Sequence, residues 1–291
     1  MDRTSIDNRK IVVILTMLIA VLAATVSLIG VFSRQIKEYA DITTSFGETI
    51  QLFQKGIYAR DSVSMASQAI AQDMVTLLVA IPFLFISLWL LKKQKEKGLF
   101  LLSGTIGYFL YTYASYSFLI VFNSLYLIYV ILMGLSFYAF ILCLMELNRL
   151  DINKWITDRF PQKSLSAFFF VSGIMIMGMW LGKIIPALAE GSAPEQLEHY
   201  ATLGIQTLDL GFVVPACLVT AYLLGKGKKW GYLLAIVLVV KMVTMTIAVS
   251  AMATLQQKNG VHVGIEERIL FLTLFLISAF FMVKMLREMR A

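Results

Sequence analysis

Eight long apolar stretches limit what this chain can fold into more strictly than any other feature of its sequence. A helix that crosses the hydrocarbon core of a bilayer, about 30 Å thick, needs about 20 mostly apolar residues. Such a helix satisfies its own backbone hydrogen bonds, so it is the structure that these stretches predict. The predicted spans cover residues 11–32, 66–91, 99–121, 124–145, 166–188, 203–224, 231–253 and 269–285.

The composition of the chain is typical of a membrane protein. Hydrophobic residues make up 59% and charged residues 15%, whereas about 25% of the residues in soluble domains are charged. The net charge of +7 comes from basic residues that lie in short clusters beside the apolar stretches, so it does not indicate nucleic-acid binding. We therefore predict one all-α integral membrane domain, residues 1–291, whose partner is the lipid bilayer and not a nucleic acid.

The first apolar stretch follows Arg3, Arg9 and Lys10, as the apolar core of a secretory signal would. However, it runs for about 22 residues, whereas the core of a signal peptide has about 7–15. An uncleaved membrane anchor is therefore the prediction.

Basic residues predict how the chain is oriented. If the N-terminus is in the cytoplasm, that side receives the basic clusters of residues 3–10, 92–97, 149–163, 226–229 and 284–290, which hold most of the 25 Lys and Arg residues. Short cytoplasmic loops are enriched in Lys and Arg, so this orientation is the favoured one. We predict a multi-pass protein of the bacterial cytoplasmic (inner) membrane with both termini in the cytoplasm.

An internal repeat is indicated by the second and sixth predicted spans. Aligned on Pro82 and Pro215 without a gap, Gly98 matches Gly231, and each of the two spans carries an acidic residue upstream of its proline. Two parallel four-helix halves, 1–150 and 151–291, would follow, as in some transporters. The alternative is that any two membrane hairpins joined by a basic loop look alike.

The longest segment between spans, residues 33–65, is predicted to lie on the outer face. Phe46, Ile50, Phe53 and Ile57 recur at helical spacing, which favours a short amphipathic helix over the outer mouth that ends at Gly56. Asp61 or Ser62 is then placed to cap the next helix. The alternative is that the segment only tethers the first span to the second. Under either interpretation, the outer candidate site residues are the polar residues Glu48, Tyr58, Arg60 and Asp61 of this segment.

Ionisable residues within a bilayer are costly unless paired, so they are the first functional candidates. Lys241 falls near the middle of the seventh predicted span, Asp209 in the outer third of the sixth, and Asp73 near the outer boundary of the second. With Gln72 and Tyr111 these residues form the predicted polar centre. The alternative is a structural ion pair of Asp209 with Lys241, or a lysine that extends to the interface.

Several classes of site are disfavoured. Cys143 and Cys217 both lie within apolar spans, and the sequence has no HExxH, GxxxxGK[ST], GxGxxG or GxSxG motif. We therefore predict no metal site and no cofactor. Glu146 is expected at the membrane interface, and Gly178 and Gly182 are expected to allow close helix packing.

Two stretches carry a resemblance to a family: GIYARDSVSMASQAIAQDMVTLLVAIP, residues 56–82, and LGIQTLDLGFVVP, residues 203–215. They resemble an uncharacterised family of bacterial multi-pass membrane proteins of about eight helices. The resemblance supplies no activity, but it implies that seven polar residues belong to one group: Tyr58, Asp61, Gln72, Asp73, Asp209, Lys241 and Thr244.

The leading hypothesis is that the chain binds or transports a small molecule or ion through a centre of Asp73, Asp209 and Lys241. That centre would be reached from outside, under the segment 48–61. One alternative is a membrane-embedded enzyme that acts on a lipid or isoprenoid, with Asp61 or Asp73 as acid or base. Another is a sensor or accessory subunit whose outer segment meets a partner protein.

Overall fold

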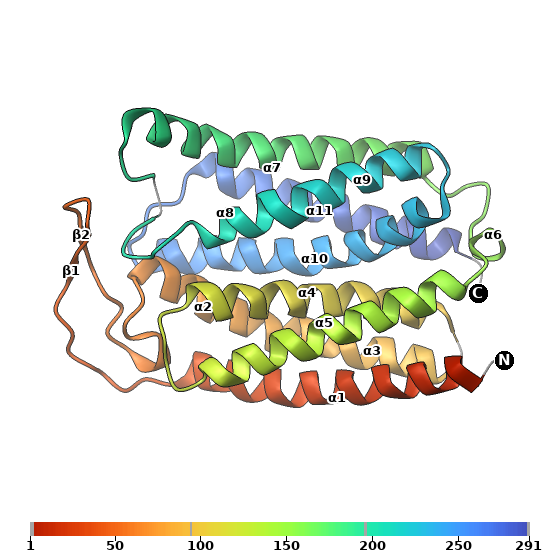
Figure 1. Cartoon of the computed structure of the whole chain (residues 1–291), viewed down its shortest axis with the longest axis horizontal. Helices are drawn as coiled ribbons and strands as arrows, with labels where there is room; N and C mark the ends of the chain where they lie inside the picture. Colours follow the sequence, from red (N-terminus) through yellow and green to blue (C-terminus); the bar gives the residue numbers. More distant parts are fainter. Residues whose placement is uncertain (1–2, 94, 195–196, 290–291) are drawn as a thin grey trace.

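The computed structural model describes residues 3–93, 95–194 and 197–289. Long helices lie side by side along one axis, and the first helix begins at the same end of the bundle at which the last helix ends (Figure 1). We call this the terminus end, and the opposite end, which carries the segment 33–62, the loop end. The helices are α1 (Arg3–Phe32), α2 (Val63–Val75), α3 (Ile81–Lys92), α4 (Lys97–Leu119), α5 (Tyr126–Arg149), α6 (Ile152–Trp155), α7 (Gln162–Glu190), α8 (Gly204–Leu208), α9 (Val214–Gly225), α10 (Lys229–Lys258) and α11 (Ile265–Glu288).

Within the described residues, seven helical segments are long and apolar enough to cross a membrane, which confirms that the chain is a multi-pass helical protein of membrane type. Each of the seven corresponds to a predicted span. The eighth predicted span, 99–121, is also helical, as α4, but Gly, Ser, Thr and Tyr residues lower its hydropathy. Most of α4 is buried against other helices, so little of its surface is left for lipid.

Two of the membrane segments contain a π-helix just before a proline. In the first, η2 (Thr76–Ala80) joins α2 to α3, and in the second, η3 (Asp209–Val213) joins α8 to α9. Proline has no N–H to donate and its ring collides with the carbonyl four residues earlier, so the wider π turn accommodates Pro82 and Pro215. The Ile81 N–H bonds to the carbonyl of Thr76, and the Val214 N–H to that of Asp209.

The helices pack in two groups. In the first, α1 and α4 pack on α5, and α3 packs on α4; in the second, α9 lies against α7 and α10, and α11 against α10. The groups meet where α10 packs on α2 and α4. The crossing of α4 and α10 is close, because a Cβ built on Gly104 would lie 2.4 Å from Cβ of Val240 and 2.7 Å from the carbonyl oxygen of Val237.

The prediction of an amphipathic helix in the outer segment is wrong. Residues 33–62 form a small antiparallel hairpin of β1 (Ile42–Thr43) and β2 (Thr49–Ile50), followed by a 3₁₀ turn, η1 (Gly56–Tyr58). Its strand residues are β-branched, and Gly47, with φ of 85°, allows the tight turn between them. Gly56 does have a left-handed conformation, with φ of 63°, but no helix precedes it.

Helix α2 begins at the predicted cap, because the Ser62 hydroxyl accepts a 3.0 Å hydrogen bond from the Met65 N–H. Gly178 and Gly182 make no close helix contact in the described chain, contrary to expectation.

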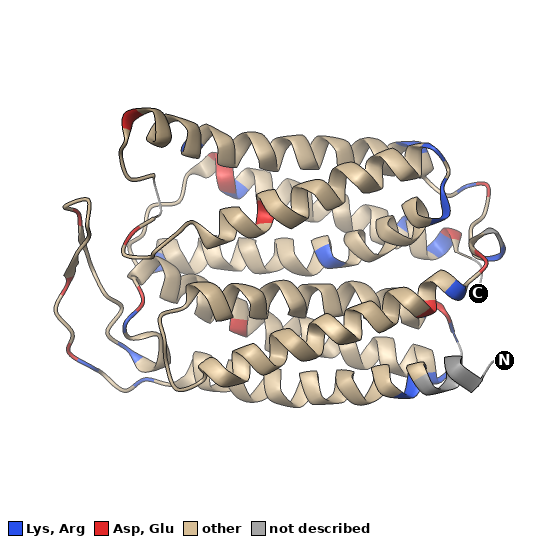
Figure 2. Ribbon diagram, in the orientation of Figure 1, with Lys and Arg blue, Asp and Glu red and all other residues tan. Residues whose placement is uncertain are grey.

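Charged residues gather at the two ends of the bundle and few lie between them (Figure 2). At the terminus end, Glu146 lies in the last turns of α5 and is only 2% exposed, so neighbouring side chains cover its carboxylate. The predicted interfacial depth of this residue stays a prediction. Glu146 pairs with Arg149 at 2.6 Å and with Arg9 at 3.3 Å, and Arg9 also pairs with Glu96 at 2.9 Å. This network ties α1 to α5 and to the start of α4. Arg290, in the last basic cluster, lies outside the described residues.

Candidate functional site

The first polar centre is built around Asp73, near the end of α2, which is 1% exposed. Its carboxylate lies near three hydroxyl groups: Ser27 of α1 at 3.0 Å, Tyr58 of η1 at 2.6 Å and Tyr116 of α4 at 3.2 Å. Gly30 permits this approach, because a Cβ there would lie 1.8 Å from Oδ2 of Asp73. A carboxylate is thereby held within the first helix group, inside a membrane segment.

Further tyrosines complete a cage around this carboxylate, and we call Ser27, Tyr58, Asp73, Tyr113, Tyr116 and Tyr129 the Asp73 cage. Tyr113 and Tyr129 are fully buried, and their rings contact that of Tyr116, with centroids 5.8 and 5.2 Å away. The Tyr113 hydroxyl lies beside Ser27, and the Tyr129 hydroxyl beside Tyr58 and Asn123. Neither makes a hydrogen bond of normal geometry in the described chain.

The second polar centre lies where the two helix groups meet. Asp209, the first residue of η3, accepts a 2.7 Å hydrogen bond from the Tyr111 hydroxyl of α4 and a 2.9 Å bond from the indole N–H of Trp180 of α7. The Lys241 ammonium of α10 lies 4.2 Å from the centroid of the Tyr111 ring. We call these four residues the Asp209 centre.

Lys241 interacts electrostatically with Asp209, but the two side chains form no ion pair in the described chain. Instead the aliphatic part of Lys241 packs beside Gly107, and its charge rests on the negative face of the Tyr111 ring. Among the described residues, no acceptor hydrogen-bonds to its Nζ. Tyr111 thus lies between the two charges, with its ring toward the lysine and its hydroxyl on the aspartate.

Of the five residues predicted to form one polar centre, three lie in the Asp209 centre, namely Tyr111, Asp209 and Lys241. Asp73 lies in its own cage, and Gln72 donates a 2.6 Å hydrogen bond to Thr112 of α4. Next to it, Thr76 and Tyr108 share a 2.9 Å hydrogen bond. Helix α4 therefore carries contacts to both centres, with Tyr116 in one and Tyr111 in the other.

The outer candidates are not gathered in one place. Tyr58 enters the Asp73 cage, Glu48 is exposed in the hairpin, and the Arg60 guanidinium lies 5.3 Å over the ring of Tyr39. Asp61 is 1% exposed, and its Oδ1 accepts bonds from the Val121 N–H at 2.9 Å and the Tyr200 hydroxyl at 3.1 Å.

Asp61 belongs to a contact between the two groups at the loop end. Ser62, its neighbour, donates a short hydrogen bond to Glu198, which lies with Tyr200 in the loop before α8. Burial raises the pKa of the Asp61 carboxyl to about 7, although the bonds from Val121 and Tyr200 oppose this effect. Burial also raises the pKa of Glu198. We call Asp61, Ser62, Glu198 and Tyr200 the loop-end latch.

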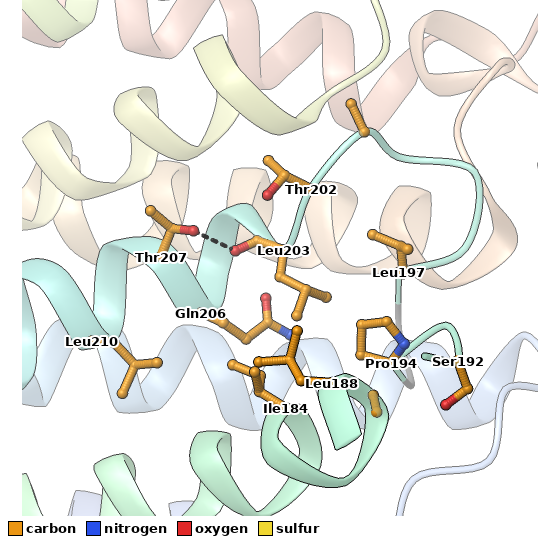
Figure 3. A pocket seen from close by; sticks show the side chains of 12 residues that line it. Ile184, Leu188, Ser192, Pro194, Leu197, Thr202, Leu203, Gln206, Thr207 and Leu210 are labelled. Carbon is orange, nitrogen blue, oxygen red and sulfur yellow. Dashed lines mark hydrogen bonds between the residues drawn. The ribbon is translucent and has the colours of Figure 1, made fainter. Parts of the chain in front are cut away.

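Two pockets open near the loop end. One, of about 360 Å³, lies between the end of α7 and α8. Its lining is mostly apolar and includes Gln206 and Leu210 (Figure 3), which lie three residues before and one residue after Asp209 in the chain. The other, of about 340 Å³, lies between η1 and the turn from α4 to α5, and is lined in part by Lys37, Arg60 and Asn123.

Sequence reasoning missed Ser27, Trp180, Glu198 and Tyr200 as partners of these acidic residues. Ser27 is one of several small polar residues in apolar spans, and Trp180 is typical of membrane interfaces, so neither pattern was specific. The recurrence of Tyr along α4 was the one feature of the sequence that indicated hydrogen-bond partners for these acidic residues.

Comparison with known proteins identifies no relative: no protein-family model, no curated protein and no solved structure matches the chain significantly. The resemblance to an uncharacterised bacterial family is therefore not supported by a family model, and function must be argued from the two polar centres alone.

Proposed function

We propose that this protein binds a small solute with an anionic group at the Asp209 centre and transports it across the membrane. The observation that carries the proposal is Lys241, an ammonium group in a membrane segment with no hydrogen-bond acceptor among the described residues. Such a charge is costly in hydrocarbon unless a partner or water meets it. A carboxylate or phosphate group of a solute would supply the missing acceptors.

The neighbours of Lys241 support a specific role for each residue. Trp180 and Tyr111 hold the Asp209 carboxylate by hydrogen bonds, so this carboxylate is kept away from direct pairing with the lysine. The lysine stays available for a ligand, while Asp209 reduces the cost of its charge when the site is empty. The site also joins both helix groups, since α4 belongs to the first and α7, η3 and α10 to the second.

We propose further that the groups are two parallel repeats. Aligned on Pro82 and Pro215, η2 and η3 cover matching residues, as do α3 and α9. Gly98 and Gly231 match as well, and a Cβ at either would lie within 2.5 Å of a backbone nitrogen in the preceding helix. Gly104 matches Val237, and these two residues contact each other at the crossing of α4 and α10. Matched residues meet at an axis of two-fold symmetry, so this contact supports a pseudo-two-fold axis between the halves.

In this proposal the two halves move relative to each other to expose the Asp209 centre to one side and then the other. The termini are cytoplasmic and the loop end faces outward, in accordance with the basic clusters at the terminus end. The pocket beside Gln206 and Leu210 is the route from outside, because both residues lie within one helical turn of Asp209. The loop-end latch closes this side.

Transport can be tested with the full-length protein in liposomes, using a panel of radiolabelled small carboxylates and inorganic phosphate as probes. We expect uptake of at least one probe, and we expect Lys241→Met to abolish it. Lys284→Met is the matched control. Lys284 lies near the C-terminal end of α11, beside Phe280, and is not part of the Asp209 centre. Uptake that persists unchanged in Lys241→Met would contradict the proposal.

A further inference from the structure

The Asp73 cage differs from the Asp209 centre because no positive charge accompanies it. Asp73, Tyr58 and Tyr116 come from three elements of the first helix group, and Ser27 from a fourth. Among the described residues, no Lys or Arg side chain contacts the Asp73 carboxylate. The cage therefore offers one negative charge and several neutral oxygens, within a membrane segment.

The hydroxyl of Tyr116 indicates where a positive charge would fit beside the Asp73 carboxylate. Its oxygen lies 2.8 Å from the carbonyl oxygen of Ala69 and 3.2 Å from Oδ1 of Asp73. A hydroxyl has one proton, so it donates to one of these acceptors at a time. When it donates to Ala69 at the shorter distance, its lone pairs face the carboxylate oxygen, and a positive charge between the two oxygens would stabilise this arrangement.

Two more buried oxygens near Asp73 make no hydrogen bond of normal geometry among the described residues. They are the hydroxyls of Tyr113 and Tyr129, both of which interact electrostatically with Asp73. Buried polar atoms without partners are rare in folded proteins, and each needs an explanation. Protonation of Asp73 would supply a single new donor, which can serve at most one of these two hydroxyl oxygens at a time.

We propose that the Asp73 cage binds a dehydrated monovalent cation of about the size of Na⁺. Hard cations prefer oxygen ligands, and the single carboxylate matches a single positive charge. Asp73 and the hydroxyl oxygens of Tyr113, Tyr116 and Tyr129 are the ligands. This site is separate from the Asp209 centre and does not depend on solute transport, so cation binding is expected even if no solute moves.

The second pocket supplies a route to the cage. Asn123 lines this pocket and also lies beside the Tyr129 hydroxyl, so it connects the pocket to the cage. Lys37 and Arg60 stand on the rim and oppose cation entry, although both are exposed and salt screens them. We therefore expect Arg60→Gln to increase the apparent affinity for Na⁺.

Thermal unfolding of the purified full-length protein in detergent tests this inference. Wild type is compared in NaCl and in choline chloride at equal ionic strength, and we expect saturable stabilisation by Na⁺, about 5 °C at saturation. Asp73→Asn should abolish this difference. Absence of any Na⁺-dependent shift in wild type, or a shift that follows pH alone, would overturn the inference.

Tyr113→Phe and Tyr129→Phe provide the sharper test, since each removes a hydroxyl without disturbing a normal hydrogen bond. If these oxygens bind the cation, each variant needs about tenfold more Na⁺ for half-maximal stabilisation. If they are merely unsatisfied groups, each variant is at least as stable as wild type in both salts, and the inference fails. Tyr138→Phe, at an exposed tyrosine of α5 outside the cage, is the matched control.

Discussion

Thr76 and Tyr108 share a hydrogen bond of 2.9 Å at the two positions that the alignment on Pro82 and Pro215 matches with Asp209 and Lys241. The first pair is neutral and fully buried, and the second pair is charged and only partly buried. If the halves are repeats, matching positions hold a neutral hydrogen-bonded pair in the first half and a charged pair in the second. This contrast favours the Asp209 centre as the position at which the two halves differ in function.

Our first prediction concerns the coupling between Asp209 and Lys241. Asp209→Asn should leave Lys241 without its nearest negative charge, and Lys241→Met should leave Asp209 without its nearest positive one. The double variant should therefore be less destabilised than the sum of the single variants, by about 1 kcal/mol. Thermal unfolding of the four proteins in detergent measures this coupling. Additive effects would mean that the two charges do not interact.

The second prediction is a pH dependence of the loop-end latch. The pKa of Asp61 is about 7 in the folded protein, and its ordinary value is 3.8. Between these two pH values the folded protein holds a proton that the unfolded chain has released, so stability falls as pH rises through this window. The raised pKa of Glu198 acts in the same direction.

Hydrogen exchange of residues 197–203 measures the opening of the latch directly. We expect exchange to accelerate as pH rises from about 4 to about 7 and to level off above about 7, after correction for the intrinsic pH dependence of exchange. Asp61→Asn resembles the protonated carboxyl and should keep the latch closed at pH 8. If the variant and wild type open to the same extent at every pH, Asp61 does not control the latch.

The third prediction uses the close contact of Gly30 with the Asp73 cage. In Gly30→Ala the new Cβ would lie 1.8 Å from Oδ2 of Asp73, so the carboxylate or α1 must shift. We expect destabilisation of about 3 kcal/mol and loss of the Na⁺ effect. Gly134→Ala is the control, because nothing lies within 4 Å of its Cβ and alanine favours the helix. Equal stability of the two variants would argue against a compact cage.

The helical spans were largely predictable, because hydrocarbon imposes a length and a composition that each span carries by itself. The segment 33–62 was not. Phe46, Ile50, Phe53 and Ile57 have helical spacing, but β-branched residues and the turn at Gly47 favoured the hairpin, and so short a segment carries few periods of either pattern.

Ionisable residues in the spans stand out in the sequence, but their grouping depends on helix packing. The sequence favoured one shared centre for Asp73 and Asp209, whereas the two carboxylates contact different residues of α4, Tyr116 and Tyr111. The sequence also did not predict where two helices approach each other closely. The spacing of Gly178 and Gly182 favoured packing there, whereas the tight crossing is at Gly104, which has no such motif.

The last prediction concerns Glu146, which holds the terminus end of the first helix group together. Its carboxylate is 2% exposed and accepts hydrogen bonds from Asn8, Arg9 and Arg149. Glu146→Gln removes the charge that two guanidinium groups share, and because the site is buried we expect a loss of about 3 kcal/mol in the free energy of unfolding.

Glu96 is the natural comparison, because it also pairs with Arg9 but its side chain is 16% exposed. Water compensates part of a lost charge at the more accessible site, so Glu96→Gln should cost about 1 kcal/mol. Thermal unfolding in detergent, with and without 1 M salt, separates the two variants. If Glu96→Gln is the more damaging change, the link between α1 and α4, and not that between α1 and α5, holds this end of the bundle.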